Sequence, residues 1–444
     1  MPNDVISKLA VEYQPVGNLA AFSSNARSHS KHQIRQIAAS IEQFGFTNPV
    51  LIDNKNTIIA GHGRVAAARL LGMGQVPTIR LESLTDDQIR AYVIADNRIA
   101  EKAGWDKSIL AIELQHLLTI DLKFDVTITG FEVPEIDLIL SETGKKQNQD
   151  DIFDIDETHQ AVTQVGDLWK LGKHRVLCGN ALEAAPFKTL MAGRRAHLVF
   201  ADPPYNVPIA GHVSGNGSVQ HRDFMMASGE MTEAEFTAFL VTSLSLLARH
   251  STSGSIHFIC MDWRHAGELL AAGKQIYDVW VNVCVWVKNN GGMGSFYRSR
   301  HELVFVFKNG KGAHRNNVML GQFGRNRSNV WEYASAPTFS RQGDEGNLLH
   351  SHPTVKPVAL VADAILDCSA RGEIVLDSFL GSGSTLIAAE RVGRVCYGIE
   401  IDPRYVDVAI RRWQRYTADS AVHELSGKRF DDLVAAAEGG HGRP

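Results

Sequence analysis

The sequence contains few cysteines, and their positions do not fit a disulfide framework or a zinc site. Five cysteines occur in the 444 residues, an odd number, and none belongs to a C-x-x-C pair. Scattered cysteines of this kind are typical of proteins in a reducing compartment. None of the 18 histidines lies at a recognisable metal-ligand spacing. We therefore expect no disulfide and no bound metal.

Long hydrophobic runs and an excess of one charge are also missing. No stretch of about 18 uncharged apolar residues occurs, which argues against a membrane-spanning helix. The first residues lack the basic start and apolar core of a signal peptide. The predicted location is therefore the cytoplasm, with no membrane partner. The net charge of −4 means that any binding of nucleic acid has to rest on a local basic patch.

The length of the chain and one polar segment indicate two domains. A chain of 444 residues exceeds the size at which a single core keeps growing. Residues 141–159 are polar and then acidic, with few aromatic residues, as in a linker. We predict one domain at residues 1–140, a second at 160–420 and a C-terminal tail at 421–444.

Both predicted domains have an α/β pattern. In the first, residue spacing predicts helices at 32–44, 64–71 and 86–100 and strands at 49–52, 57–60 and 76–81. In the second, it predicts strands at 197–201, 255–260, 280–287, 303–307, 374–376 and 395–399 and helices at 232–249, 356–370 and 384–392. Apolar strands that alternate with helices predict a mostly parallel sheet covered on both faces.

Residues 374–385 combine a strand, a glycine turn and the start of a helix. The turn contains Gly381 and Gly383 but lacks the third glycine of the dinucleotide fingerprint and the lysine of a P-loop. Hydrolysis of a nucleoside triphosphate at this turn is therefore not expected. The next strand ends at Glu400, and such an acid can accept hydrogen bonds from both ribose hydroxyls. The two features favour a nucleoside ligand; the alternative is a plain tight turn beside a surface acid.

Another apolar strand runs into Asp202-Pro203-Pro204-Tyr205. The two prolines stop the strand and stiffen the chain at its carboxyl end, where ligands bind in open α/β sheets. An exocyclic amine of a nucleobase is a poor nucleophile because its lone pair is delocalised into the ring. Hydrogen bonds to Asp202 and to the Pro203 carbonyl would favour an available lone pair, and Tyr205 could stack on the base. A rigid loop after a strand is the alternative.

These motifs, in this order, resemble the amino-methyltransferases of DNA. More specifically, they resemble the β class, in which the Asp-Pro-Pro-Tyr motif precedes the cofactor glycine motif. Residues 166–179, 286–288, 300–302 and 352–357 resemble further segments of that class. The resemblance extends over residues 160–416.

The resemblance implies a fold, a cofactor and a reaction. The fold is a Rossmann-like S-adenosylmethionine-dependent methyltransferase sheet of seven strands with a reversed last hairpin. The cofactor is S-adenosyl-L-methionine. The implied reaction is methylation of adenine N6 in duplex DNA, with the base flipped out of the stack. Asp as the first motif residue favours adenine in this family, and cytosine N4 is the alternative.

The resemblance also implies individual site residues. The implied catalytic residues are Asp202, Pro203, Pro204 and Tyr205. The implied cofactor-binding residues are Asp377, Phe379, Gly381, Gly383, Thr385, Glu400, Thr354 and Lys356, with the last two near the methionine end of the cofactor.

The N-terminal part resembles a second family. Residues 48–52 and 59–68 are similar to the ParB/sulfiredoxin-type domain, which implies a smaller α/β fold. Sulfiredoxin chemistry is excluded, because no cysteine precedes Cys178. Gly61 and Gly63 lie ahead of a helix and, together with Arg64, could bind the phosphate of a nucleotide. A scaffold that binds DNA or a partner without catalysis is the equal alternative.

Residues 288–330 form a basic segment in which Glu302 is the one acid. We predict that its cations contact DNA phosphates; the residues are Lys288, Arg298, Arg300, Arg315, Arg325 and Arg327. Target-recognition elements are expected within 206–229 and 288–345, and the first of these is expected to close over a flipped base. A solvated basic surface is the alternative.

Two other functions compete with DNA methylation. One is a non-catalytic, ParB-like DNA-binding protein with an inactive methyltransferase domain, against which the intact catalytic motif and Glu400 argue. The other is methylation of RNA or protein, which the ParB-like domain and the basic segment disfavour. A homodimer and a partner restriction endonuclease stay open, because the sequence decides neither.

Overall fold

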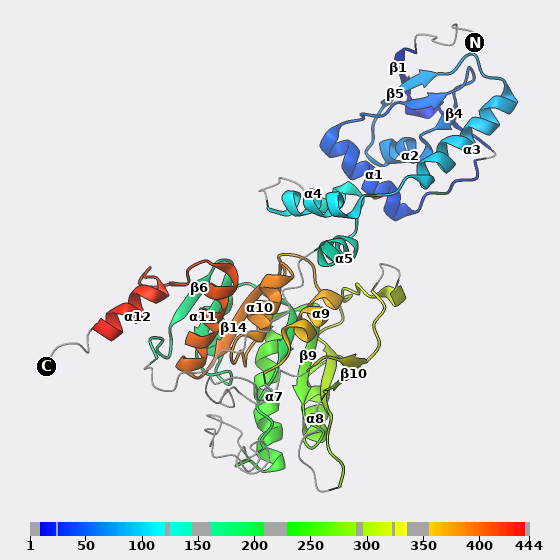
Figure 1. Cartoon of the computed structure of the whole chain (residues 1–444). Helices are drawn as coiled ribbons and strands as arrows, with labels where there is room; N and C mark the ends of the chain where they lie inside the picture. The colour runs from blue at the N-terminus through cyan, green and yellow to red at the C-terminus, as the bar shows by residue number, and fades with distance from the viewer. Residues whose placement is uncertain are drawn as a thin grey trace. The chain divides into compact units, whose positions relative to one another are not determined.

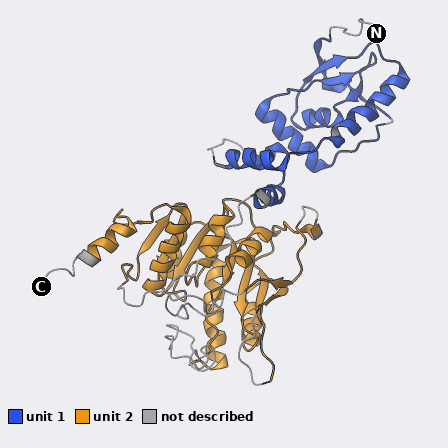
Figure 2. Ribbon diagram, viewed as in Figure 1, with its two compact units in different colours: residues 1–145 blue, residues 146–444 orange. Residues whose placement is uncertain are grey.

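The structure is a computed structural model that describes residues 9–23, 25–119, 125–143, 161–207, 229–289, 296–321, 325–334 and 355–439. The chain divides into two compact units, Met1–Lys145 and Lys146–Pro444 (Figure 1, Figure 2). No helix among the described residues is long and apolar enough to cross a membrane.

Unit 1 is built on a five-stranded mixed sheet with the strand order β1-β5-β3-β4-β2. The strands are Val11–Pro15 (β1), Ala20–Ala21 (β2), Val50–Ile52 (β3), Thr57–Ala60 (β4) and Gln75–Arg80 (β5). Helices α1 (Lys31–Phe44), α2 (His62–Leu70) and α3 (Asp86–Lys102) accompany the sheet. Val50, Ile52, Val65 and Val76 are buried together, so strand residues and α2 share one core.

Two further helices of unit 1 were not predicted from the sequence. Helices α4 (Lys107–Thr119) and α5 (Val133–Thr143) pack on a short core formed by Leu114, Val126 and Ile136. Helix α5 extends into the predicted linker 141–159, and residues 144–159 lie outside the described part of the chain.

Unit 2 contains a sheet of ten strands in the described residues, with the order β12-β10-β11-β9-β8-β13-β14-β7-β6-β15. Strands β9, β8, β13, β14 and β7 are mutually parallel, while β11 runs antiparallel to β9 and β10. Their bounds are Leu168–Leu171 (β6), His174–Cys178 (β7), Ala196–Ala201 (β8), Ser251–Met261 (β9), Val279–Val287 (β10), His301–Lys308 (β11), Val330–Glu332 (β12), Ile374–Asp377 (β13), Val395–Glu400 (β14) and Val422–His423 (β15).

Helices cover both faces of this sheet, as the strand sequences predict. Along β8, Leu198 and Phe200 face one core while Val199 and Ala201 face the other, because successive side chains of a strand point to opposite faces. Helices α9 (Val358–Cys368), α10 (Ser384–Arg391) and α11 (Pro403–Thr417) contribute to the first core. Helices α6 (Ala184–Met191), α7 (Glu233–Arg249) and α8 (Ala266–Ile276) contribute to the second. The α/β prediction is therefore confirmed.

Two predictions about unit 2 need correction. The sheet has ten described strands and not seven, because β12 extends one edge and β6 and β15 extend the other. Residues 421–437 do not form a tail. Strand β15 pairs with β6, and α12 (Phe430–Gly439) begins with the buried Phe430, whose ring packs edge-on against Trp169.

Candidate active site

The topology brings the predicted catalytic and cofactor motifs to one edge of the sheet. Strand β8 ends at Ala201, directly before Asp202, and its neighbour β13 ends at Asp377. Strand β14, the next neighbour, ends at Glu400. Because these strands are parallel, their carboxyl ends meet, which is where ligands bind in open α/β sheets.

A buried charge cluster surrounds Asp202. The Nζ atom of Lys356 lies 2.6 Å from Asp202 Oδ2, 2.9 Å from Glu302 Oε2 and 3.0 Å from the Tyr205 hydroxyl. The Tyr205 hydroxyl donates to Asp202 Oδ1 at 2.6 Å and lies 3.1 Å from Glu302 Oε2. Lys288 forms an ion pair with the other oxygen of Glu302. The cluster thus joins two carboxylates to two ammonium groups.

The fold explains why these distant residues meet. Glu302 is the second residue of β11, which is antiparallel to β9 and therefore begins at the edge where β9 ends. Lys288 directly follows β10, opposite the start of β11. Lys356 lies two residues before α9. Glu302 was not predicted as a site residue, although an isolated acid at the start of an apolar strand was an available signal.

The positions of the four charges determine which carboxylate is the more basic. Burial would raise the pKa of Glu302, but Lys356 and Lys288 outweigh burial and hold that pKa below its ordinary value. Burial raises the pKa of Asp202; Lys356 and the Tyr205 hydroxyl oppose this shift, while Glu302 adds to it. Burial disfavours a charged Lys356, but Asp202 and Glu302 outweigh burial and raise its pKa. Asp202 is therefore the carboxylate better suited to take up a proton.

The cofactor loop presents its backbone to the same edge. Gly381 and Gly383 adopt left-handed backbone conformations, with φ of 52° and 87°. A Cβ atom at Gly381 would have no neighbour within 4 Å, whereas one at Gly383 would lie 2.9 Å from Ala409 Cβ. Gly381 thus borders open space, and Gly383 is required by packing against α11.

The acids of this loop are buried but hydrogen-bonded. Glu400 accepts the Gly381 N–H at 2.8 Å and the Asp402 N–H at 2.9 Å, and Asp377 accepts the Phe379 N–H at 2.9 Å. Burial raises the pKa of both Glu400 and Asp377 to about 7. Because each carboxylate oxygen has a second lone pair, both acids can still accept hydroxyl or amine donors from a ligand.

One further group fits a polar ligand at this loop. The hydroxyl of Ser378 is buried, and among the described residues it meets no hydrogen-bond partner. Thr385, also buried, hydrogen-bonds Asp377. A nucleoside with an amino-acid tail matches such a mixture of acids, hydroxyls and approachable backbone. Thr354, predicted near the methionine end, lies outside the described residues.

Lys356, which the resemblance places near the methionine end of the cofactor, lies against the Asp-Pro-Pro-Tyr motif. Its ammonium group is directed to Asp202, Tyr205 and Glu302, at the catalytic motif. Pro203 is buried beside them and Pro204 half-buried. Lys356 therefore lies in one cluster with Asp202 and Glu302, and its contact with the cofactor stays a prediction.

Asn206, which follows the catalytic motif, holds two segments together. Its Nδ2 donates to the Met231 carbonyl at 2.7 Å, and its Oδ1 accepts the N–H groups of Gly229 and Met231. Of the predicted recognition element 206–229, residues 208–228 lie outside the described part of the chain. Asn206 thereby holds Gly229 and Met231 close to the catalytic motif.

The predicted set of DNA-contacting cations is only partly retained. Arg298 and Arg300 are exposed next to Glu302, beside the exposed rings of Phe296 and Tyr297. Lys288 instead turns inward to Glu302. Arg315 pairs with Glu373 at 3.1 Å, just before β13 begins, and so lies at the opposite edge of the sheet from Asp202.

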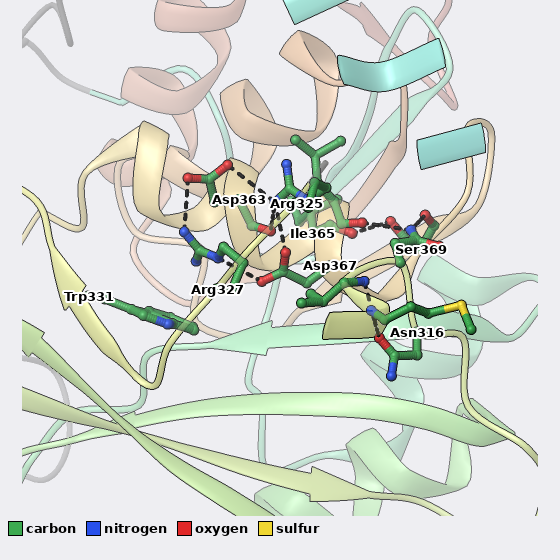
Figure 3. Close-up of polar contacts among 12 residues, drawn as sticks. Asn316, Arg325, Arg327, Trp331, Asp363, Ile365, Asp367 and Ser369 are labelled. Carbon is green, nitrogen blue, oxygen red and sulfur yellow. Dashed lines mark hydrogen bonds and ion pairs between the residues drawn. The ribbon is translucent and has the colours of Figure 1, made fainter. Parts of the chain in front are cut away.

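Arg325 and Arg327 are turned toward helix α9 (Figure 3). Arg325 lies 2.7 Å from Asp367, and Arg327 lies 3.2 Å from both Asp367 and Asp363. The guanidinium of Arg327 also lies over the Trp331 ring. Asp363 and Asp367 of α9 thus neutralise part of the positive charge of the basic segment, although they lie far from it in the sequence. Both guanidinium groups are held by carboxylates of α9, and the contact of Arg325 and Arg327 with phosphate stays a prediction.

In unit 1, packing accounts for the glycines of the predicted phosphate site. Gly61 has a left-handed conformation and precedes α2, and a Cβ at Gly63 would lie 2.9 Å from Ile37. The Arg64 guanidinium donates to the Asn48 carbonyl at 3.0 Å. These contacts favour the scaffold interpretation of Gly61, Gly63 and Arg64.

Comparisons with protein families agree with this division of the chain. Residues 196–411 match the model described as DNA methylase, residues 108–165 the ParB-methyltransferase HTH domain and residues 5–97 the ParB N-terminal domain. The second match includes α5 and all of α4 except its first residue, Lys107.

Two relatives cover different parts of the chain. The ParB-like nuclease domain-containing protein YnaK of Escherichia coli (strain K12) is 56% identical over 81 residues, 18% of this chain and 93% of that protein. The type II methyltransferase M.HpaI of Haemophilus parainfluenzae is 25% identical over 252 residues, 54% of this chain and 73% of that protein.

Among solved structures, M1.HpyAVI is 18% identical with a TM-score of 0.38, covering 53% of this chain and 96% of that chain. The PvuII DNA methyltransferase (cytosine-N4-specific) is 13% identical with a TM-score of 0.42, covering 61% of this chain and 94% of that chain. The chain thus combines a DNA methylase domain of the N6/N4 family at residues 196–411 with a ParB-like N-terminal domain at residues 5–97.

Proposed function

We propose that the protein methylates the N6 amine of adenine in duplex DNA, with S-adenosylmethionine as the methyl donor. The observation that carries the proposal is the adjacency of Asp202 to Asp377 and Glu400, at the carboxyl ends of neighbouring parallel strands. One edge of the sheet thus offers an acceptor for an amine beside acids suited to a nucleoside cofactor.

The cofactor supplies an electrophilic methyl group on a sulfonium sulfur. Glu400 and Asp377 would hold its polar groups, with Ser378 as a further donor or acceptor. Asp202 and the Pro203 carbonyl would accept the N–H groups of the target amine, and Tyr205 would lie against the base. Positioning and electrostatic stabilisation, not a strong base, would supply most of the acceleration.

Access to Asp202 requires the target base to leave the duplex stack, at a cost of a few kcal/mol. Arg298 and Arg300, with the neighbouring exposed Phe296 and Tyr297, are proposed to bind DNA beside the site. Asp at the first motif position favours adenine over cytosine N4 in the family that the sequence resembles.

The proposal is tested by incubating the purified protein with duplex DNA and S-adenosylmethionine and analysing nucleosides by mass spectrometry. We expect N6-methyladenine in the wild type. Asp202→Ala should abolish transfer and leave cofactor affinity within about threefold of wild type. N4-methylcytosine as the sole product would refute the adenine assignment, and no modified base of either kind would refute DNA methylation.

A further inference from the structure

The charge cluster at Asp202 is assembled from four separate parts of unit 2. Asp202 follows β8, Lys288 follows β10, Glu302 begins β11 and Lys356 precedes α9. Trp286 lies beneath both lysines, with the Lys288 and Lys356 ammonium groups 4.8 Å and 5.9 Å from its ring centroid. Side chains of Glu302 and Lys356 are 9% and 4% exposed. Burial of charge costs free energy unless every charge has a partner. A buried cluster of four charges beside the catalytic motif therefore suggests that these charges serve the reaction.

We propose that Lys356, Glu302 and Lys288 are positioning residues that set how readily Asp202 takes up the proton of the methylated amine. The inference rests on the proposed function and deepens it. Lys356 touches Asp202 directly. Glu302 acts through Lys356, whose ammonium it shares with Asp202, and Lys288 acts through Glu302.

The transfer step requires such a proton acceptor. The lone pair of the target amine forms the new N–C bond as the methyl C–S bond breaks, and the electron pair of that bond stays on sulfur. The amine then carries a positive charge and one proton more than the product. Asp202 takes this proton and becomes a neutral carboxyl group. The charge pattern around Asp202 therefore bears directly on this step.

The two sides of the network act on Asp202 in opposite directions. Lys356 stabilises the ionised form of Asp202, whereas Glu302 opposes it through like-charge repulsion. Removal of Lys356 should therefore make Asp202 harder to ionise, and removal of the Glu302 charge should make it easier. A role in packing alone would not produce shifts of opposite sign.

Other groups face Asp202, but none of them would make the Lys356 and Glu302 variants shift its ionisation in opposite directions. The Tyr205 hydroxyl contacts Asp202, and Cys260 on β9 and Asp377 on β13 lie near enough for electrostatic interaction. Burial raises the pKa of Tyr205 and of Cys260 well above their ordinary values, so both stay neutral. Burial raises the pKa of the Asp377 carboxyl to about 7, but Asp377 is present in the wild type and in every variant, so it does not by itself produce shifts of opposite sign.

The test is the single-turnover rate of methyl transfer on duplex DNA between pH 5 and pH 9, at saturating S-adenosylmethionine. We expect Lys356→Met to move the acidic limb of the profile upward by about one pH unit or more. Glu302→Gln should move it downward by about one pH unit. Lys288→Met should also move the acidic limb upward, but by less than Lys356→Met, because Lys288 contacts Glu302 and not Asp202 itself.

Glu424→Gln and Lys170→Met are matched controls. They change a carboxylate and an ammonium 3.3 Å apart in a more exposed ion pair, and they should leave the limb in place. If Lys356→Met does not fold, the opposite shifts of Lys288→Met and Glu302→Gln decide the question. Equal rate losses with an unmoved limb would overturn the inference while wild-type activity upholds the proposed function. An inactive wild type would instead refute the function itself.

Discussion

At the scale of single residues, the proposed cofactor contact of Glu400 predicts that cofactor affinity depends on pH. Its carboxylate is buried and accepts two backbone N–H groups, and burial raises its pKa to about 7. The ionised form is the better acceptor for two ribose hydroxyls. A ligand that donates to it favours the ionised state, so its affinity should rise as pH increases through 7.

We predict that S-adenosylmethionine binds the wild type more tightly at pH 8 than at pH 6. Glu400→Gln should bind about tenfold more weakly at pH 8, with a smaller dependence on pH. Some dependence should remain, because Asp377 has a similar pKa. Isothermal titration calorimetry at both pH values measures this, with Glu424→Gln as a control. The same pH slope in Glu400→Gln would exclude the carboxylate as the titrating group.

Without ligand, the same carboxyl group has the opposite effect on stability. The folded state keeps the Glu400 proton up to about pH 7, whereas the unfolded chain loses it near the ordinary value of 4.5. Between these values the folded state binds more protons, so the contribution of this group to the free energy of unfolding falls as pH rises. The ionised Glu400 carboxylate is thus destabilising at neutral pH when no ligand donates hydrogen bonds to it.

At the scale of elements, the two glycines of the turn between β13 and α10 are needed for different reasons. Both Gly381 and Gly383 have left-handed conformations, but only Gly383 faces a close neighbour, Ala409. We expect Gly383→Ala to lower the free energy of unfolding by about 1–3 kcal/mol. Gly381→Ala should cost about 1 kcal/mol and mainly weaken cofactor binding. Urea unfolding and calorimetric titration of both variants measure these effects; a reversed order of stability would contradict the packing argument.

A second prediction at this scale concerns the attachment of residues 325–333 to α9. Asp367 pairs with Arg325 and Arg327, its side chain is 10% exposed, and Tyr333 donates to the neighbouring Asp363. Removing one partner of a buried pair leaves charge uncompensated. We therefore expect Asp367→Asn to lower the free energy of unfolding by about 3 kcal/mol.

Glu424→Gln provides the comparison for Asp367→Asn. Glu424 also contacts two cations, Lys170 and Arg175, but its side chain is 32% exposed. Its loss should cost at most about 1 kcal/mol, because water screens and replaces exposed ion pairs. Urea unfolding midpoints of the two variants decide the matter, and equal midpoints would show that the α9 cluster does not stabilise the fold.

At the scale of the whole molecule, two units with separate hydrophobic cores predict separate unfolding. The described core residues of unit 1 and those of unit 2 form different clusters. Differential scanning calorimetry should therefore show two transitions. S-adenosylmethionine at about one hundred times its Kd should stabilise only the larger unit, by about 2.7 kcal/mol. A single transition whose midpoint rises with S-adenosylmethionine would contradict the prediction that the two units unfold independently.

Several features of this protein could be predicted from the sequence because they depend on neighbours along the chain. The alternation of apolar strands and helices predicts a mostly parallel sheet, and β8, β13 and β14 lie at the predicted residues. The prolines after Ala201 and the glycines after Leu380 mark the ends of strands through their own backbone preferences. Helices α4 and α5 were missed because weak local patterns depend on a small tertiary core for their stability.

What the tertiary structure alone decided is which charges meet. Lys356 and Asp202 are 154 residues apart, yet their side chains lie 2.6 Å apart because β8 and the chain before α9 reach the same edge of the sheet. For the same reason, Arg325 and Arg327 meet acids of α9 and not solvent. Electrostatic energy depends on distance and burial, and neither quantity is present in a linear sequence. The sequence thus determined the reaction family, and the packing of the sheet determined the charges that surround Asp202.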